Sequence, residues 1–414
     1  MANLLYLVHR LPYPPNKGDK VRSYHLLKHL AARHTVFLGT FVDDPQDEAH
    51  VPAVRSLCAD LHVARLRPNA AKLRSLLGFF KRQALSLGYY QDAGLRRWVA
   101  KTRADQKIDA TVVFSSAMAQ YAPQAKGAVE GPMLVDFVDV DSAKWAQYAT
   151  QHAWPMSWVY AREGARLLAY DRALAARARR SFFVTEKETD LFRQLAPECA
   201  DAVEAMGNGV DSDFFAPDPA RATPFPPGEV PVVFTGAMDY WPNVDAVSWF
   251  VADMLPALRK AFPQLRFYIV GRSPTPAVRA LASDAAVVTG TVADVRPYLQ
   301  HAAVVVAPMR VARGVQNKIL EAMAMARPVV AAHECVQAID AVPDEELVHA
   351  TTAPDYVNAV QNLLTQPGQA ARVGAAGRAR VVAQYSWYAH LARIDRYLPG
   401  ANPIGAGCAK ETQQ

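Results

Sequence analysis

The sequence predicts an α/β protein with two domains, each built on a buried parallel sheet. The chain has 414 residues, enough for two separate hydrophobic cores of roughly 200 residues each. Short apolar runs such as Leu4–Val8, Thr111–Ser115 and Leu265–Val270 alternate with stretches of helical length, as buried parallel strands do. A hydrophobic fraction of 51% and a charged fraction of 20% are ordinary for a globular protein of this class.

The border between the domains is predicted near Gly209. The segment 207–220, GNGVDSDFFAPDPA, begins with residues that allow left-handed backbone and continues into prolines that stop a helix. Pro217–Pro231 is the expected linker. We therefore predict a first domain over residues 1–209, a second over 210–385, a final helix over 386–398 and a disordered tail over 399–414.

The charge is unevenly distributed. Residues 1–208 hold 28 lysines and arginines against 21 aspartates and glutamates, a net charge of +7, and the remainder holds 17 against 18, or −1. A basic first half indicates an anionic partner. Nucleic acid is not expected, because no recognised binding motif accompanies the charge.

The cysteines and the apolar runs indicate the cellular compartment of the protein. Four scattered cysteines, with no CxxC pair and no zinc-like spacing, predict reduced thiols in a cytoplasmic protein and no metal site. The sequence contains no run of about 18 uncharged apolar residues, so no membrane span is predicted.

The first domain carries polar residues after its strands. The loop from His9 to Lys20 follows the first strand, and Asp139 and Asp141 follow a later one, at the carboxyl edge of the sheet. Asp19 can instead be a helix N-cap, and Asp141 with Ser142 can cap the next helix. His9 has the chemistry of a base, but as a lone histidine at a strand end it is interpreted as structural.

The segment Arg65–Tyr90 contains a basic amphipathic helix by its pattern. Leu73, Leu76 and Leu87 can share one face, with lysines and arginines beside it. Such a helix can pack on its own sheet or lie on a membrane surface, and the sequence leaves both interpretations open.

The stretch 307–332, APMRVARGVQNKILEAMAMARPVVAA, organises the second domain. Its apolar ends read as two strands, and a helix is expected to begin at residue 315 or 316, after Gly314. The N-terminus of a helix between parallel strands favours an anion, and Lys318, Arg310 and Arg313 add positive charge. Glu321 lies on the same helix side as Lys318 and can accept hydrogen bonds from hydroxyls. A sugar nucleotide offers both groups.

This stretch also carries a family resemblance. GVQNKILEAMAMARPVV resembles the donor-site segment of retaining glycosyltransferases of the GT-B fold, family 4 (glycosyl transferases, group 1). Two glutamates eight positions apart commonly frame the nucleotide sugar there; Glu321 matches the second, and Arg313 occupies the place of the first. Gly314 and Lys318 fit a GxxxK variant of the segment. The resemblance extends over nearly the whole chain and is strongest to bacterial sugar transferases of exosortase (PEP-CTERM) and exopolysaccharide clusters.

The resemblance implies two Rossmann-like domains facing each other across a cleft, with the last helix crossing back to the first domain. It implies a nucleotide-diphosphate sugar donor, a glycan or lipid-linked acceptor, and no cofactor. The catalytic candidates are Lys318, Arg310, Arg313 and Glu321. The donor-binding candidates are Gly236, Asn243, Gly271, Arg272, Thr291, Val292, Gly314, Val315, Gln316 and Asn317, and the acceptor-side candidates are Gly18, Asp19, Arg22, Asp139 and Asp141.

One departure from the family pattern concerns the donor diphosphate. Many members carry an arginine just after the glycine that Gly236 matches, and a lysine five residues later. Ala237 and Pro242 stand in those places. We expect Arg310, Arg313 and Lys318 to supply the missing charge.

The predicted function is therefore a hexosyltransferase (EC 2.4) in exopolysaccharide or cell-surface glycan synthesis, with retention implied by the resemblance. No DxD-type pair lies in the donor half, which predicts a metal-independent reaction. The location expected is cytoplasmic, with peripheral attachment to an anionic membrane, the inner face of the plasma membrane, through the basic domain. The alternatives are a sugar-nucleotide 2-epimerase of the same architecture and a non-catalytic sugar-binding or polysaccharide-binding protein. A dinucleotide oxidoreductase is disfavoured, because no GxGxxG follows the first strand.

Overall fold

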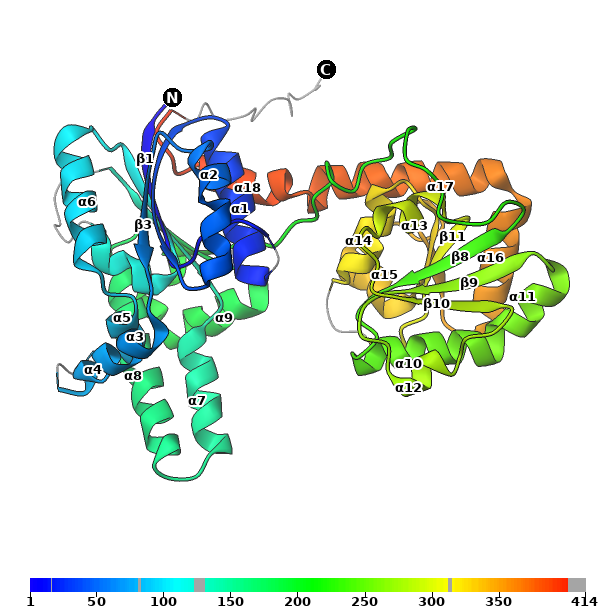
Figure 1. The fold of residues 1–414 in the computed structure, drawn as a ribbon, viewed down its shortest axis with the longest axis horizontal. Helices are drawn as coiled ribbons and strands as arrows, with labels where there is room; N and C mark the ends of the chain where they lie inside the picture. The colour runs from blue at the N-terminus through cyan, green and yellow to red at the C-terminus, as the bar shows by residue number, and fades with distance from the viewer. Residues whose placement is uncertain (16, 81–82, 123–130, 312–314, 401–414) are drawn as a thin grey trace, which may run out of the picture. The chain divides into compact units, whose positions relative to one another are not determined.

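The computed structural model describes residues 1–15, 17–80, 83–122, 131–311 and 315–400. The chain forms two compact units (Figure 1). The first comprises Met1–Asn208 together with the residues from His390 onward, and the second comprises Gly209–Ala389.

The first unit is built on a seven-stranded sheet in the order β3-β2-β1-β4-β5-β6-β7. Its strands are β1 (Asn3–Val8), β2 (Thr35–Val42), β3 (Asp60–Arg65), β4 (Ala110–Phe114), β5 (Met133–Val138), β6 (Arg180–Phe183) and β7 (Val203–Ala205). All pairings are parallel. The order reverses between β1 and β4, so the ends of these two strands meet at the same edge, where Val8 pairs with Phe114. This is the place where open parallel sheets bind ligands.

Helices flank this sheet on both sides (Figure 1). They are α1 (Gly18–Ala31), α2 (Val51–Arg55), α3 (Pro68–Ser75), α4 (Leu77–Phe80), α5 (Leu85–Tyr89), α6 (Ala93–Asp105), α7 (Asp141–Gln151), α8 (Met156–Ala175) and α9 (Glu186–Leu195). The apolar strand residues, among them Leu5, Val113 and Phe183, are fully buried against them.

The prediction of a single amphipathic helix within residues 65–90 is wrong. The segment folds into α3, α4 and α5, and its leucines do not share one face: Leu87 is buried, whereas Leu73 is 71% exposed. Gly88 explains part of the break, because a Cβ there would lie 2.9 Å from the Cα of Ser75. The chain turns back on itself at this close approach.

The last helix, α18 (Trp387–Asp395), begins in the second unit and ends in the first. Within the first unit, Asp395 pairs with Nε2 of His29 at 2.8 Å, and Arg393 donates to the carbonyl of Ala205 at 2.6 Å. The C-terminal part of α18 is therefore held by the first unit.

The second unit is built on a six-stranded parallel sheet in the order β10-β9-β8-β11-β12-β13. The strands are β8 (Val230–Thr235), β9 (Leu265–Val270), β10 (Ala286–Gly290), β11 (Val304–Ala307), β12 (Val329–Ala332) and β13 (Val348–Ala350). The helices are α10 (Trp241–Trp249), α11 (Leu255–Ala261), α12 (Pro276–Arg279), α13 (Arg296–His301), α14 (Asn317–Ala324), α15 (His333–Ile339), α16 (Ala353–Thr365) and α17 (Pro367–Arg380). The sheet order reverses between β8 and β11.

Helix α14 connects the central strands β11 and β12, and it begins one or two residues later than predicted. Ile319, Leu320 and Met323 are fully buried in the core of this unit, as the helical spacing predicted. Their burial fixes the rotation of α14, so that Lys318 and Glu321 lie on the side facing the carboxyl ends of the strands.

Among the described residues, no helix has the length and the apolar character needed to cross a membrane.

Candidate functional site

A cavity of about 590 Å³ lies at the carboxyl ends of the central strands of the second unit. The ends of β8 and β9, the segment after β10 and the N-terminus of α14 border it. The structure brings these predicted residues together in its lining: Gly236, Asn243, Gly271, Arg272, Thr291, Val292, Val315, Gln316, Asn317, Lys318 and Glu321. The candidates came from positions spread over 86 residues of sequence, between Gly236 and Glu321.

Lys318 is the principal cation of this cavity. Its ammonium donates a hydrogen bond to Oδ1 of Asn243 and lies 4.3 Å from the centroid of the Phe234 ring. Among the described residues no carboxylate forms an ion pair with it. Burial lowers the pKa of Lys318 to about 8, although the Cys335 and Glu321 side chains act in the opposite direction. The ammonium is held by an amide and a ring, which leaves its charge for an anion to neutralise.

Glu321 lies one helical turn further along the same wall. Burial raises the pKa of its carboxyl to about 7, and the nearby charge of Lys318 lowers it by less. This carboxyl group is therefore protonated more readily near neutral pH than an exposed glutamate is. It can accept a hydrogen bond from a hydroxyl group of a ligand.

Two glycines let the strand ends approach each other. A Cβ at Gly271 would lie 1.6 Å from the carbonyl oxygen of Gly236, so no larger residue fits there. A Cβ at Gly236 would lie 2.6 Å from Nδ2 of Asn243 and 3.3 Å from Nζ of Lys318. Because Gly236 has no side chain, the ammonium of Lys318 can lie against the backbone at the end of β8.

Arg310 does not line this cavity. Its guanidinium pairs with the carboxylate of Asp245 on α10 and lies 5.3 Å from the Trp249 ring centroid. The hydrogen bond to Asp245 raises the pKa of Arg310. The prediction that Arg310 faces the donor phosphates is not supported by this arrangement, because its charge is already neutralised. Arg313 and Gly314 lie outside the described residues.

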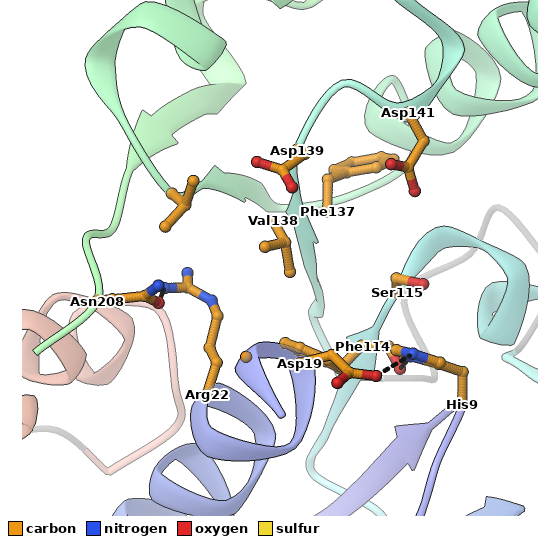
Figure 2. Close-up of a pocket in the computed structure, with 12 residues that line it drawn as sticks. His9, Asp19, Arg22, Phe114, Ser115, Phe137, Val138, Asp139, Asp141 and Asn208 are labelled. Carbon is orange, nitrogen blue, oxygen red and sulfur yellow. Dashed lines mark hydrogen bonds and ion pairs between the residues drawn. The ribbon is translucent and has the colours of Figure 1, made fainter. Parts of the chain in front are cut away.

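A second pocket, of about 360 Å³, lies where the sheet order of the first unit reverses (Figure 2). Gly18, Asp19, Arg22, Asp139 and Asp141, the predicted acceptor-side residues, all line it. His9, Ser115 and Asn208 line it as well.

Asp19 and His9 face each other in this pocket (Figure 2). Nε2 of His9 lies 3.4 Å from the carboxylate of Asp19, and Arg10 donates to the same oxygen at 2.7 Å. Burial raises the pKa of Asp19, but the hydrogen bond with His9 and the charge of Arg10 outweigh it, so the pKa lies well below its usual value. Asp19 therefore stays ionised, and it lies within the first turn of α1, whose N-cap is Lys17.

Arg22 is fully buried and is occupied by protein partners. It forms a bidentate ion pair with Asp136 on β5, with N–O distances of 2.7 and 3.1 Å. It also donates a hydrogen bond to Oδ1 of Asn208 at 3.0 Å. This pair fixes the floor of the pocket. Arg22 was predicted to contact the acceptor. The structure gives it a structural role instead, because Asp136 already neutralises its charge.

Asp139 and Asp141 share one cation. The ammonium of Lys144 lies 2.7 Å from Asp139 and 3.1 Å from Asp141. Val138, just before them, has φ of 71°, which a β-branched residue rarely adopts. Asp139 and Asp141 follow this unusual backbone at the end of β5, and both line the pocket.

The sequence analysis missed several residues that shape these sites. His9 was interpreted as structural, yet it stacks on Phe114 and borders the pocket. Asp136 lies within an apolar strand, where no periodic signal marks it. Asp245 is separated from Arg310 by 65 residues, so only the fold reveals their pairing. In the described part of the chain, no group of three His, Cys, Asp or Glu side chains is placed to hold a metal ion.

The sequence of the second unit matches a known family. Residues 229–366 match the model described as Glycosyl transferases group 1, and this stretch contains the whole lining of the larger cavity. No curated protein matches the chain in sequence.

Solved structures share the fold over nearly the whole chain. Sucrose-phosphate synthase from Thermosynechococcus elongatus has 19% identity and a TM-score of 0.57, with 96% of this chain and 98% of that chain covered. HepE of Anabaena, in complex with UDP and glucose, has 15% identity and a TM-score of 0.56, with 96% and 99% covered. WaaG, a glycosyltransferase involved in lipopolysaccharide biosynthesis, has 14% identity and a TM-score of 0.53, with 96% and 100% covered. These structures have the GT-B fold, and the prediction of that fold is confirmed.

The close approach at Gly236 generates a test of the cavity as an anion site. Gly236→Ala places a methyl group against Asn243 and Lys318 and displaces the ammonium. We expect it to weaken the binding of pyrophosphate by about tenfold or more, the loss of one charge-assisted hydrogen bond. Isothermal titration calorimetry measures this affinity. Gly368→Ala is the control, because its added Cβ meets no atom within 4 Å. Equal affinity in the two variants would contradict the anion site.

Proposed function

We propose that this protein transfers a glycosyl group from a nucleoside diphosphate sugar to a hydroxyl group of an acceptor. The observation that carries the proposal is the position of Lys318 and Glu321 in one cavity, at the start of α14 and the reversal point of the sheet. The match of residues 229–366 to group 1 glycosyl transferases supports it. HepE, with UDP and glucose bound, supports a nucleotide-sugar donor.

Lys318 and the first turn of α14 are proposed to bind the donor diphosphate. Glycosyl transfer breaks the bond between the sugar and the diphosphate, and negative charge grows on the departing phosphate oxygen. Lys318 supplies a positive charge to that oxygen, and the N-terminal N–H groups of α14 supply hydrogen bonds. Charge-assisted hydrogen bonds contribute about 1.5–3 kcal/mol each, so two or three of them account for a large part of leaving-group stabilisation.

Glu321 and the neighbouring strand ends are proposed to orient the rest of the donor. The Glu321 carboxylate accepts hydrogen bonds from ribose or sugar hydroxyls. Thr291 and Val292, just after β10, offer fixed main-chain groups to the nucleobase, and Arg272 follows β9 at the same edge. Such main-chain contacts position a base without selecting its identity.

The acceptor is proposed to bind in the first-unit pocket. Its carboxylates, Asp19, Asp139 and Asp141, are acceptors for sugar hydroxyls, and Ser115 adds a hydroxyl. The ionised Asp19 holds His9 at the pocket wall. We propose transfer with retention, in which the acceptor hydroxyl passes its proton to the leaving phosphate, so that no separate protein base is required.

The finer expectations stay predictions. They are a hexosyl donor, independence of metal, membership of family 4, and a role beside an exosortase in exopolysaccharide synthesis. The same holds for a cytoplasmic location with peripheral membrane attachment, and for a glycan or lipid-linked acceptor.

Replacing the two principal residues tests the proposed chemistry. Lys318→Ala and Glu321→Ala should each lower turnover on the order of 100-fold, because each removes an electrostatic contact to the reacting donor. Release of nucleoside diphosphate from a panel of nucleoside diphosphate sugars measures turnover. Lys260→Ala and Glu345→Ala, which change exposed residues of the same unit, are the matched controls.

Three outcomes would contradict the transferase. Rates near wild type in both Lys318→Ala and Glu321→Ala would exclude this cavity as the donor site. Formation of an epimeric sugar nucleotide without any acceptor would indicate the 2-epimerase. Tight donor binding with no turnover under any condition would indicate a sugar-binding protein.

The pKa of Lys318 predicts a pH dependence of UDP binding. A diphosphate binds the charged form of Lys318, whose pKa in the free protein is about 8. As the pH rises above 8, the free protein loses this proton, and the affinity should fall by up to about tenfold per pH unit. Lys318→Met should bind UDP more weakly at pH 7.5 and show a shallower profile between about pH 7.5 and 9, because the deprotonation of Lys318 no longer contributes. Titration calorimetry in matched buffers measures both profiles; identical profiles would exclude Lys318 as the diphosphate ligand.

A further inference from the structure

The α7–α8 hairpin of the first unit (Figure 1) has large apolar side chains exposed at its turn. Trp154, in the turn between the helices, is 81% exposed, and Trp158 in the first turns of α8 is 56% exposed. Met156, between them, is exposed as well. Exposed large apolar side chains that gather in one place mark a candidate interaction surface.

Helices α3 and α4 extend this surface. The rings of Phe79 and Trp158 stack with their centroids 5.9 Å apart, and Arg162 donates to the carbonyl of Gly78 at 2.7 Å. These contacts fasten α4 to α8. Leu73 and Leu76, at the end of α3 and just after it, are exposed. The exposed residues Leu73, Leu76, Trp154, Met156 and Trp158 are called the apolar tip.

The described part of α3 and the residues just before it are basic. Residues 65–76 contain four arginines and lysines and no aspartate or glutamate, although Arg65 pairs with Glu48. Lys72 and Arg67 are exposed on α3 and just before it. These exposed cations complement an anionic partner. Exposed tryptophans with basic residues beside them are typical of surfaces that lie in the interface of a lipid bilayer.

Two further pockets adjoin the first-unit pocket and extend toward α8. The first of these pockets shares His9, Ser115 and Asp141 with the first-unit pocket. The second, lined mainly by apolar and aromatic side chains, shares Tyr90 and Trp145 with the first and reaches Val159, beside Trp158. The one carboxylate in its lining, Glu163, is occupied by the N–H groups of Leu85 and Ser86.

We propose that the apolar tip is a docking surface for an anionic lipid bilayer. Trp154 and Trp158 enter the headgroup region, and the lysines and arginines beside them contact lipid phosphates. If the protein is the transferase proposed above, its acceptor is carried on a lipid. The docking surface itself does not depend on that activity.

Vesicle sedimentation tests the docking surface with the full chain. Wild type should bind vesicles of equal parts phosphatidylcholine and phosphatidylglycerol at low salt, and bind phosphatidylcholine alone much more weakly. Trp154→Ala with Trp158→Ala should lower the affinity by about tenfold or more. Trp154→Ala alone, in the turn, gives the same direction of change if the double variant unfolds. Trp241→Ala removes an exposed tryptophan of the second unit and should keep wild-type binding.

Charge reversal separates the electrostatic contribution. Arg67→Glu with Lys72→Glu should weaken binding to the anionic vesicles by about tenfold or more, and Lys101→Glu, on α6, should not. Wild-type protein that ignores phosphatidylglycerol, or tryptophan variants that bind as wild type does, would overturn the proposal. A dimer that disappears in the tryptophan variants would instead assign the tip to a second copy of the chain.

UDP titration of the same variants keeps the two proposals apart. Variants that lose vesicle binding and still bind UDP support the docking surface. If the wild-type protein does not bind UDP, the proposed transferase function is overturned, and the result for the docking surface is unchanged.

Discussion

The burial of one ammonium group at the end of a parallel sheet determines the chemistry of the second unit. Lys318 can occupy its position only because Gly236 has no side chain, because Asn243 offers an oxygen, and because α14 is fixed by its buried residues. Burial costs the charged form free energy, as the lowered pKa shows. A ligand that brings negative charge to this place recovers that free energy, so the cavity favours an anion before any specific contact is considered.

The two units use cations in opposite ways. In the first unit the buried cations are neutralised by the protein: Lys20 pairs with Asp47 at 2.6 Å, and Arg22 pairs with Asp136 at 2.7 Å. These pairs fix the structure, and what they leave facing the pocket is carboxylate and hydroxyl, which suits a polyol. In the second unit Lys318 is half-buried, and no carboxylate among the described residues forms an ion pair with it. The same strand order therefore provides a site for hydroxyl groups in one unit and a site for a phosphate in the other.

The sequence predicted those features that depend on local spacing. Lys318 and Glu321 are three residues apart on one helix, and the glycines at Gly236 and Gly271 directly follow apolar strands, so their place at the sheet edge follows from the pattern. Features that depend on distant pairing were not predictable in this way. Arg310 was assigned to the phosphates because it lies near Lys318 in sequence, but Asp245 on another helix binds it. Part of the break of the segment 65–90 reflects the approach of Gly88 to Ser75, which no helical periodicity reveals.

Hydrogen–deuterium exchange with UDP tests the central claim most directly, because it reports where on the chain the ligand lies. If the diphosphate is bound by Lys318 and the first turn of α14, saturating UDP should slow the exchange of the backbone amides over residues 315–321 and 236–243. The first unit should then show no comparable protection, and Lys318→Met should weaken the effect. Protection confined to the first unit, or no change at 315–321 while UDP is bound, would contradict the account.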